Sequence, residues 1–415
     1  MREMKDSGIS WVGEIPKEWS VWRNKYIFKI TKDIVLPSKS YQLLSLTTTG
    51  IKEKDENDNG GKVPENYDGY QIVKENDLVM CLFDLDCSAV FSGLSPYNGM
   101  ISPAYKVLKV KKRIANEQYY RYWFNYVGSK RFYKQYSKSL RFTLNADEFN
   151  RLFSLLPPLD EQQRIAEFLD RECGKIDGLK ADIQAQIDTL EQYKRSVITE
   201  AVTHGLNLSA PMKDSGIPWV GQFPTHWTKK KGKYILRYMS KPVRQDDGVI
   251  TCFRDGEVTL RSNRREDGFT MADKEIGYQG VDVGDLVVHG MDGFAGAIGI
   301  SDSRGKASPV LNVLNTKQNK KYIMYYLRSM AYGEVFTALS TGIRVRSCDL
   351  RWNKLAELLY PLPPIDEQNN IVNYIDEQIA RTNEIIADKK SQIETLDGYK
   401  KSLIYEYVTG KKEVV

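Results

Sequence analysis

The opening of this sequence occurs twice. Residues 4–19 read MKDSGISWVGEIPKEW and residues 212–227 read MKDSGIPWVGQFPTHW, with 11 of 16 positions identical. Three further pairs follow in the same order at offsets of 206 to 208 residues: GYQIVKENDLV with GYQGVDVGDLV, SPAYKVL with SPVLNVL, and PPLDEQ with PPIDEQ. Collinear matches at one offset indicate a tandem duplication. Its unit of about 207 residues is far longer than a solenoid repeat and is the size of a domain.

Each unit divides into a mixed lobe and a helical region. Short β-branched runs punctuated by glycine predict strands, such as YQLLSLTT and DLVMCLF in the first copy and GVITCF, EVTLRSN, DLVVHG and AIGIS in the second. A helical stretch follows at 116–137 and at 320–340, and a short capped helix is expected from Asn145 and from Ser347. The predicted fold class is α+β. Its predicted lobes are residues 1–158 and 207–362, and its helical regions are residues 159–206 and 363–415.

The helical regions carry one apolar stripe each. The predicted inward residues are Leu169, Ile176, Ile183, Leu190 and Val197 in the first region, and Ile375, Ile379, Ile393, Leu396 and Leu403 in the second. In the first region Cys173, Leu179, Ile187 and Tyr193 widen the stripe. In the second region the stripe also includes Ile385 and Tyr399, and Thr382 and Lys389 replace two of the heptad positions. Forty-four residues of helix are about 65 Å long, and such a helix needs a partner. A two-stranded coiled coil of the two copies is predicted. The alternative is two separate helices, each folded onto its own lobe.

The junction PPLDEQ or PPIDEQ precedes each helical region. Two prolines end the preceding strand, and Asp160 and Asp366 are expected to cap the helices, where acidic residues suit the positive helix end.

Charge is unevenly distributed along the chain. Residues 160–205 carry a net charge of −4 and residues 366–415 a net charge of −3, which leaves +13 on the remainder. Basic lobes suggest a polyanionic partner, although scattered surface lysines give the same count.

The sequence offers little catalytic chemistry. It contains no phosphate-binding GxxxxGK[ST] loop, no CxxC pair, and only three histidines that share no motif with a nucleophile. Five irregularly spaced cysteines fit a reducing compartment. The charged N-terminus does not resemble a signal peptide, and no apolar run reaches 18 residues. A cytoplasmic protein with no metal site and no membrane partner is expected.

The lobes do contain side chains that suit nucleic acid. Arginine pairs with phosphate or bidentately with guanine, and hydroxyls also contact phosphates and base edges. The candidates in the first lobe are Thr47, Thr48, Thr49, Lys52, Lys54 and Arg141, and those in the second are Arg254, Arg261, Arg264, Arg265, Arg304, Lys306, Arg344 and Arg346. For any one of these arginines a surface ion pair is an equally good interpretation. The lobes differ most in these loops, so two lobes that both contact DNA should recognise different sequences.

The doubled KDSGI-WVG and PPLDEQQRIAEFLD motifs, in this order, resemble the specificity subunits of type I restriction–modification systems over residues 4 to about 410. The resemblance implies two target-recognition domains, each reading one half of a bipartite, asymmetric DNA site. It also implies that the helices pack antiparallel and dock two methyltransferase subunits, and that restriction–translocase subunits join them. S-adenosylmethionine, ATP and Mg²⁺ are then expected in those partners, with no cofactor and no catalytic residue in this bacterial or archaeal chain. Two other hypotheses are a DNA-modifying enzyme in its own right and a coiled-coil scaffold without DNA binding.

Overall fold

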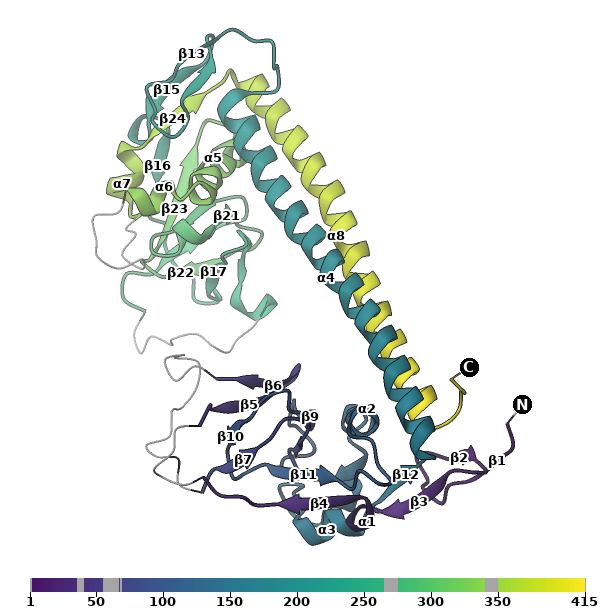
Figure 1. The fold of residues 1–415 in the computed structure, drawn as a ribbon. Coiled ribbons are helices and arrows are strands. Elements are labelled where there is room, and N and C mark those ends of the chain that lie inside the picture. The colour runs from purple at the N-terminus through teal and green to yellow at the C-terminus, as the bar shows by residue number, and fades with distance from the viewer. Residues whose placement is uncertain are drawn as a thin grey trace. The chain divides into compact units, whose positions relative to one another are not determined.

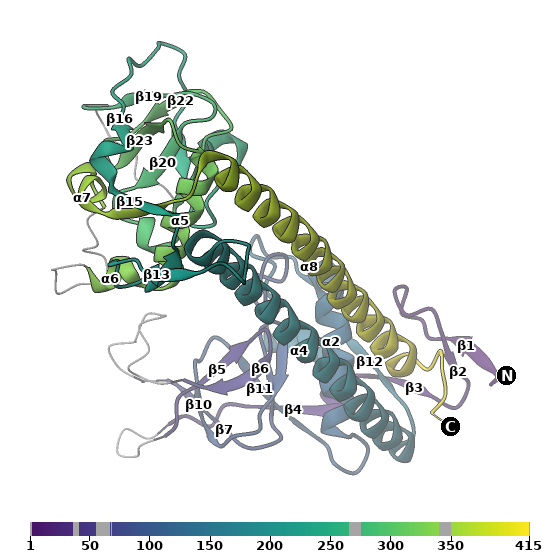
Figure 2. The same ribbon diagram turned by 90° about the horizontal axis from the view of Figure 1, so that it is seen from above.

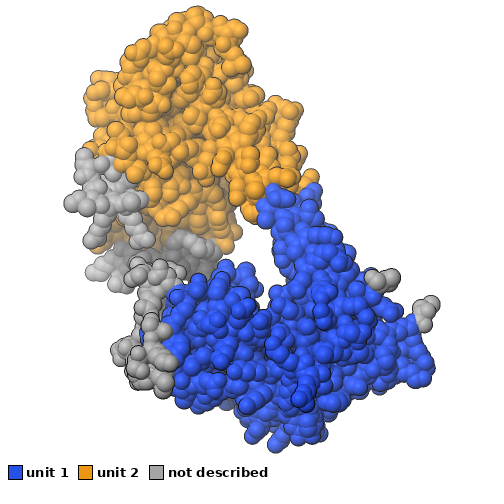
Figure 3. Space-filling model, in the orientation of Figure 1, with its two compact units in different colours: residues 1–183, 391–415 blue, residues 184–390 orange. Residues whose placement is uncertain are grey.

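The computed structural model describes residues 2–35, 41–54, 67, 69–264, 275–339 and 350–414. The chain forms two compact units, residues 1–183 with 391–415 and residues 184–390 (Figure 3). Each unit contains one mixed lobe together with part of both long helices, α4 (Leu159–His204) and α8 (Ile365–Val408). The α+β fold class with a duplicated lobe and long helices is confirmed.

The central sheet of each lobe has four antiparallel strands in the same order (Figure 1). In the first lobe the order is β4 (Phe28–Thr31), β11 (Lys106–Val110), β8 (Leu78–Met80), β9 (Ser92–Leu94). In the second lobe it is β16 (Leu236–Tyr238), β23 (Leu311–Thr316), β20 (Leu286–His289), β21 (Ile298–Ile300). The duplication seen in the sequence is therefore a duplication of topology.

Four two-stranded pairs surround each central sheet, and they also correspond. In the first lobe they are β1 (Met4–Asp6) with β2 (Glu14–Pro16), β3 (Ser20–Arg23) with β12 (Phe153–Leu156), β5 (Leu44–Thr47) with β6 (Gly50–Glu53), and β7 (Gln71–Val73) with β10 (Gly99–Ile101). In the second they are β13 (Met212–Asp214) with β14 (Gln222–Pro224), β15 (Thr228–Lys231) with β24 (Leu359–Leu362), β17 (Ile250–Cys252) with β18 (Val258–Leu260), and β19 (Gln279–Val281) with β22 (Gly305–Ala307).

The helical stretches of the lobes are broken where the sequence predicts continuity. In the first lobe α1 (Asn24–Ile27) precedes the sheet, and α2 (Glu117–Ser129) is followed by the 3₁₀ turn η1 (Phe132–Tyr136). In the second lobe α5 (Lys320–Tyr332) is followed by α6 (Val335–Ala338). Arg131 and Glu334 adopt positive φ at these breaks, 53° and 56°. A left-handed residue cannot continue an α-helix, so each stretch divides there.

The two short helices before the junctions differ in their caps. Asn145 caps α3 (Ala146–Arg151) through a reciprocal capping box with Glu148, as the sequence predicts. The matching helix α7 (Trp352–Glu357) has Arg351 at its N-cap and no side-chain cap. A start at Ser347 is therefore wrong for α7, and Ser347 itself lies outside the described residues.

Each lobe has two hydrophobic cores. The larger core lies between the central sheet and α2 or α5, where Trp123, Phe124, Tyr322 and Tyr326 are fully buried. A smaller core lies under the β5–β6 hairpin in the first lobe and under the β17–β18 hairpin in the second. The small cores fix both hairpins against the sheet.

The repeated KDSGI segment is a turn between β1 and β2, and again between β13 and β14. Asp6 accepts a hydrogen bond from the Gly8 amide at 3.0 Å, and Ser7 accepts one from the Ile9 amide at 3.1 Å. The second copy repeats both bonds, at 2.9 and 3.0 Å. Gly8 has a φ of 71°, which glycine adopts without strain. The motif therefore stabilises the same turn in both lobes.

Two repeated acids join the lobes to the helices. The indole of the fully buried Trp19 donates to Glu161 at 2.9 Å, and that of Trp227 donates to Glu367 at 3.0 Å. A second residue contacts the acid in each copy, and it differs between them. Arg2 holds Glu161 through two hydrogen bonds, whereas His226 contacts Glu367 at 2.7 Å.

The glutamine that follows each acid closes the same junction. Gln162 accepts from the Asn116 amide at 2.9 Å and donates to the Pro157 carbonyl at 2.8 Å, and Gln368 makes the matching bonds in the second unit. Because α4 begins at Leu159 and α8 at Ile365, Asp160 and Asp366 lie inside the first turn. The prediction that they cap the helices is wrong, although their charge still suits the helix end.

The two long helices pair antiparallel within each unit, as both ribbon views show (Figures 1 and 2). In the first unit Lys400 contacts both carboxylate oxygens of Asp177 at 2.6 and 2.7 Å, and Lys180 pairs with Asp397. In the second unit Lys194 donates to Asn383 at 2.9 Å. Residue numbers rise along one helix as they fall along the other, which defines the antiparallel register.

The predicted seam residues occupy the inner side of this helix pair. Leu169, Ile176, Val197, Ile375 and Leu403 are buried, and Ile183, Leu190, Ile379, Ile393 and Leu396 are half-buried. Of the six further residues predicted for the stripe, Cys173 and Ile187 are buried, whereas the other four are exposed: Leu179 by 52%, Tyr193 by 47%, Ile385 by 46% and Tyr399 by 56%. That part of the prediction is wrong, because Lys180, Lys194, Ile386 and Lys400 take the inward positions next to them.

Candidate nucleic-acid interface

The first-lobe threonine candidates lie at the turn of the β5–β6 hairpin. The Thr47 hydroxyl donates to the Gly50 carbonyl at 2.7 Å and accepts from the Thr49 amide at 3.2 Å. Thr48 and Lys52 are exposed, and Lys54 is half-buried. Thr47 therefore stabilises the turn, and Thr48, Thr49 and Lys52 are the candidates of this hairpin that face solvent.

Arg141 reaches the same lobe from the loop after η1. Its guanidinium makes a two-pronged contact with Asp84, at 3.2 and 3.1 Å, while 79% of the Arg141 side chain stays exposed. Asp84 lies four residues after the end of β8, so Arg141 binds near the C-terminal end of this strand.

The second-lobe hairpin β17–β18 holds three arginine candidates. Arg254 donates to Asp292 at 3.0 Å, and Arg261 lies 3.4 Å from the Thr251 hydroxyl. Arg264 pairs with Asp255 at 2.6 Å and with Glu257 at 3.0 Å. The hydrogen bond to Asp255 raises the pKa of Arg264 above its ordinary value. The hairpin thus presents Arg254 and Arg264 already paired with carboxylates.

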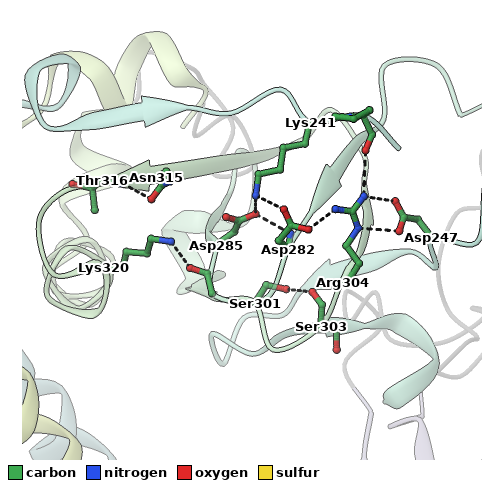
Figure 4. Close-up of polar contacts among 12 residues, drawn as sticks. Lys241, Asp247, Asp282, Asp285, Ser301, Ser303, Arg304, Asn315, Thr316 and Lys320 are labelled. Carbon is green, nitrogen blue, oxygen red and sulfur yellow. Dashed lines mark hydrogen bonds and ion pairs between the residues drawn. The ribbon is translucent and has the colours of Figure 1, made fainter. Parts of the chain in front are cut away.

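Arg304 lies in a separate ion-pair network (Figure 4), and Lys306 forms an ion pair of its own. Arg304 donates to both carboxylate oxygens of Asp247 at 3.0 Å and also contacts Asp282, which pairs with Lys241 at 2.7 Å. Hydrogen bonds from Lys241 and Arg304 lower the pKa of Asp282 to about 2. Lys306 pairs with Glu275 at 2.7 Å. DNA contact by either residue stays a prediction, and it would require breaking these pairs.

The remaining candidates, Arg265, Arg344 and Arg346, lie outside the described residues. A DNA contact by any of the three stays a prediction.

A cavity of the second lobe lies where the hairpin meets the end of β20. This cavity of about 740 Å³ is lined by Thr251, Arg254, Arg261, Arg264, His289 and Asp292, with apolar floor residues such as Ile250 and Leu311. Three of the arginine candidates are therefore gathered in one place, and two residues that sequence reasoning passed over join them.

Those two residues are His289 and Asp292. Burial lowers the pKa of His289 below its ordinary value. A signal for both was present in the internal repeat, because DLVMCLFD in the first copy aligns with DLVVHGMD in the second and both end in aspartate. Asp84 and Asp292 are thus matching residues, and each binds an arginine.

A known protein is similar to this chain in sequence along nearly its whole length. No protein-family model matches the chain. It is 22% identical, across 97% of its length and 96% of the relative's, to a putative type I restriction enzyme specificity subunit, MjaX, of Methanocaldococcus jannaschii. This finding confirms the resemblance that the sequence motifs indicate.

One solved structure agrees in fold over nearly the whole chain. One chain of a structure determined for complex assembly and conformational transition of a type I R-M system superposes with a TM-score of 0.67 at 13% identity, covering 96% of this chain and 99% of that one. The HsdS subunit from Thermoanaerobacter tengcongensis gives 0.49 at 12% identity, over 96% and 98% of the two chains. The first of these shows a shared fold of two lobes and long helices.

The described residues contain no candidate metal site. Among them, no three histidine, cysteine, aspartate or glutamate side chains are grouped as a metal site would need. Among the same residues, no helix is both long and apolar enough to span a membrane.

Proposed function

We propose that this chain is the sequence-specific DNA-recognition subunit of a type I restriction–modification complex. Each lobe reads one half of a bipartite, asymmetric DNA site, and the helices dock methyltransferase and restriction subunits. The chain contributes no catalytic residue. S-adenosylmethionine, ATP and Mg²⁺ are bound by the partner subunits, which carry out methylation, translocation and cleavage.

The observation that carries this proposal is a matched framework with unmatched side chains. The two central sheets have the same strand order, and the same hairpin lies beside each. At the end of β8 the first lobe has the buried Cys81 and an Asp84–Arg141 pair, whereas at the end of β20 the second has His289 and an Asp292–Arg254 pair. Such a chain suits a ligand with two similar halves that differ in detail, as a bipartite DNA site does.

The test is a binding experiment on the full chain together with the methyltransferase subunit of its own system. Duplex DNA should be bound with an affinity that falls steeply with salt, by about a thousandfold or more between 50 and 200 mM for roughly six phosphate contacts. Sequencing the bound duplexes should return two short motifs separated by unspecified bases. Salt-independent binding, or none, would favour the scaffold hypothesis.

The enzyme hypothesis is separated by a different measurement. The chain alone, incubated with DNA, S-adenosylmethionine and Mg²⁺, should neither methylate nor cut the DNA. Turnover by the isolated chain would contradict the non-catalytic role.

The docking part of the proposal rests on the exposed apolar side chains of the helices. Leu179 and Tyr399 in the first unit, and Tyr193 and Ile385 in the second, each precede an inward position by one residue. By heptad geometry both residues of a unit then lie on the same flank of its helix pair. Large apolar side chains at solvent indicate a contact surface. Here each unit has one tyrosine and one branched aliphatic side chain at these positions. A partner that binds twice would find equivalent surfaces.

The double variant Leu179→Asp with Ile385→Asp should therefore weaken association with the methyltransferase subunits. Gln192→Asp with Ser391→Asp adds the same charges at exposed helix positions outside this flank and is the matched control. Co-purification and mass measurement check the stoichiometry. Equal complex yields from both double variants would remove the helix flank as the docking surface.

The helix pair should also set the spacing of the two half-sites. Deleting residues 184–190 together with residues 387–393 removes one heptad from each helix in antiparallel register, which shortens the helices by about 10 Å. That length equals about three base pairs at 3.4 Å each. Methylome sequencing of a host carrying the variant should show a spacer about three base pairs shorter with both half-sites unchanged. An unchanged spacer would refute this role.

A further inference from the structure

The cavity beside β20 combines hydrogen-bond donors with an acceptor. Arg254, from the hairpin, donates to Asp292 at 3.0 Å, yet 65% of the Arg254 side chain and 37% of the Asp292 side chain remain exposed. Asp292 thus orients the arginine fork while its own carboxylate still faces the cavity. The position of the pair is held by the small core under the hairpin, where Ile250, Cys252 and Val258 are buried.

His289 adds a donor of fixed orientation. Its Nδ1 accepts hydrogen bonds from the backbone amides of Met291, at 3.2 Å, and Asp292, at 2.9 Å. Because Nδ1 is an acceptor, the proton of the neutral ring resides on Nε2. Nε2 lies 3.9 Å from the nearer Asp292 oxygen, beyond hydrogen-bond distance. Burial favours the neutral ring by lowering its pKa, so His289 offers one N–H donor at the cavity wall.

We propose that this cavity reads the major-groove edge of one G·C base pair in the half-site of the second lobe. Asp292 accepts a hydrogen bond from the cytosine N4 amino group, and Arg254 and His289 donate to O6 and N7 of guanine. The inference rests on the proposed function, and it names the residues that determine specificity in that lobe.

The mixture of charges is what favours a base over a phosphate. A phosphate site gathers donors and excludes carboxylates, whereas Asp255 and Asp292 both line this cavity and neutralise two of its three arginines. In the major groove a G·C pair presents the N4 donor of cytosine beside the two acceptors of guanine. An A·T pair offers its N6 donor with the N7 and O4 acceptors and a methyl group. Arginine binds guanine bidentately, and aspartate accepts from cytosine, so the side chains match G·C.

The experiment selects bound duplexes from a fully randomised DNA library, using the full chain with its methyltransferase subunit. The wild type should select a motif that contains a G·C pair in one half. Asp292→Asn and His289→Asn should each lower the preference at that base pair by about 5- to 150-fold, the effect of one good base contact. All other positions and the spacer should stay unchanged. In His289→Asn the amide oxygen can replace Nδ1 as the backbone acceptor, so the turn is preserved while the Nε2 donor is lost.

The control variant is Asp302→Asn, which removes an exposed carboxylate of the same lobe outside the cavity and should leave the motif unchanged. If the wild type selects no motif, the proposed function fails and this inference fails with it. If the wild type selects a motif and both cavity variants select the same one, the inference alone is overturned. A variant that loses one whole half-site together with thermal stability is misfolded, and the turn-preserving His289→Asn then decides.

Discussion

The two lobes hold an acidic residue at the same place and supply its arginine from different segments. Asp84 follows β8 and is bound by Arg141 from the loop after η1, and Asp292 follows β20 and is bound by Arg254 from the β17–β18 hairpin. Beside the acid stands a buried thiol, Cys81, in one lobe and an imidazole, His289, in the other. The framework has kept the position of the pair while the direction from which the cation arrives has changed.

This difference distinguishes residues that the duplicated unit needs for folding from residues that it exposes at its surface. Exposed ion pairs contribute at most about 1 kcal/mol to stability, so neither Asp–Arg pair is required to hold its lobe together. The tryptophan–glutamate junctions are of the opposite kind, since Trp19 and Trp227 are fully buried and contact matching acids. Variants at the two kinds of position should therefore behave differently.

The largest effect is expected at the junctions. Trp19→Ala and Trp227→Ala should each lower the free energy of unfolding by about 3–5 kcal/mol, because each leaves a large cavity and removes a hydrogen-bond donor from an acid, Glu161 (buried) or Glu367 (half-buried). Hydrogen exchange followed by mass spectrometry should locate the loss in the unit that carries the variant. Trp22→Ala, at a tryptophan that is 41% exposed, is the control and should cost little. Equal loss of protection in both units would mean that the lobes do not fold independently.

The fold could be predicted from the sequence wherever the pattern had one interpretation. The repeat identified two lobes of one topology, and the heptad of Leu169 and Ile176 identified the inner side of α4. The pattern failed where lysine was involved. Lys180 and Lys400 take inward positions because their alkyl stems cover apolar surface while their amines reach Asp397 and Asp177. Choosing the apolar neighbours Leu179 and Tyr399 placed the stripe one residue away.

The candidate site was less predictable for a geometric reason. Arg254 and Asp292 are 38 residues apart and meet only because the hairpin folds beside β20. No local spacing encodes that contact. His289 was dismissed for lacking a catalytic partner, although its place three residues before Asp292 in DLVVHGMD was visible in the repeat. For Arg304 the sequence left a base contact and a surface ion pair equally open, and the structure shows ion pairs with Asp247 and Asp282.

A smaller effect should sharpen the comparison at the first lobe. If Asp84 and Arg141 occupy the place of Asp292 and Arg254, Asp84→Asn and Arg141→Lys should relax one base position in the other half-site by about 1–3 kcal/mol. Arg141→Lys keeps the charge and loses the two-pronged contact with Asp84, so non-specific affinity should be retained. Selection from a randomised library measures both. A change in the same half-site that the Asp292 variant alters would show that the lobes do not read separate halves.

The smallest effect concerns stability at acidic pH, because the matching turns of the two lobes contain carboxyl groups whose pKa values are shifted in opposite directions. In the turn before β8 the Lys74 amide donates to Asp77 at 2.9 Å, and burial raises the pKa of Asp77. In the turn before β20 the corresponding amide belongs to Asp282, whose pKa the Lys241 and Arg304 contacts lower to about 2. A raised carboxyl pKa stabilises the fold at low pH, and this contribution disappears as the pH rises through it. A lowered pKa stabilises the fold above the ordinary value near 4, and this contribution is lost as the pH falls towards 2.

Acidification from pH 5 towards pH 2 should therefore destabilise the second lobe relative to the first. The difference should stay under about 1 kcal/mol, because Asp282 is 44% exposed and solvent screens its ion pairs. Hydrogen exchange of peptides from each central sheet, corrected for the intrinsic pH dependence of exchange, measures the two lobes in the same sample. Asp282→Asn should reduce the loss of protection that acid causes in the second lobe. Asp77→Asn should reduce the stabilisation that acid causes in the first lobe. Parallel loss of protection in both lobes, unaffected by either variant, would show that this pair of turns does not distinguish them.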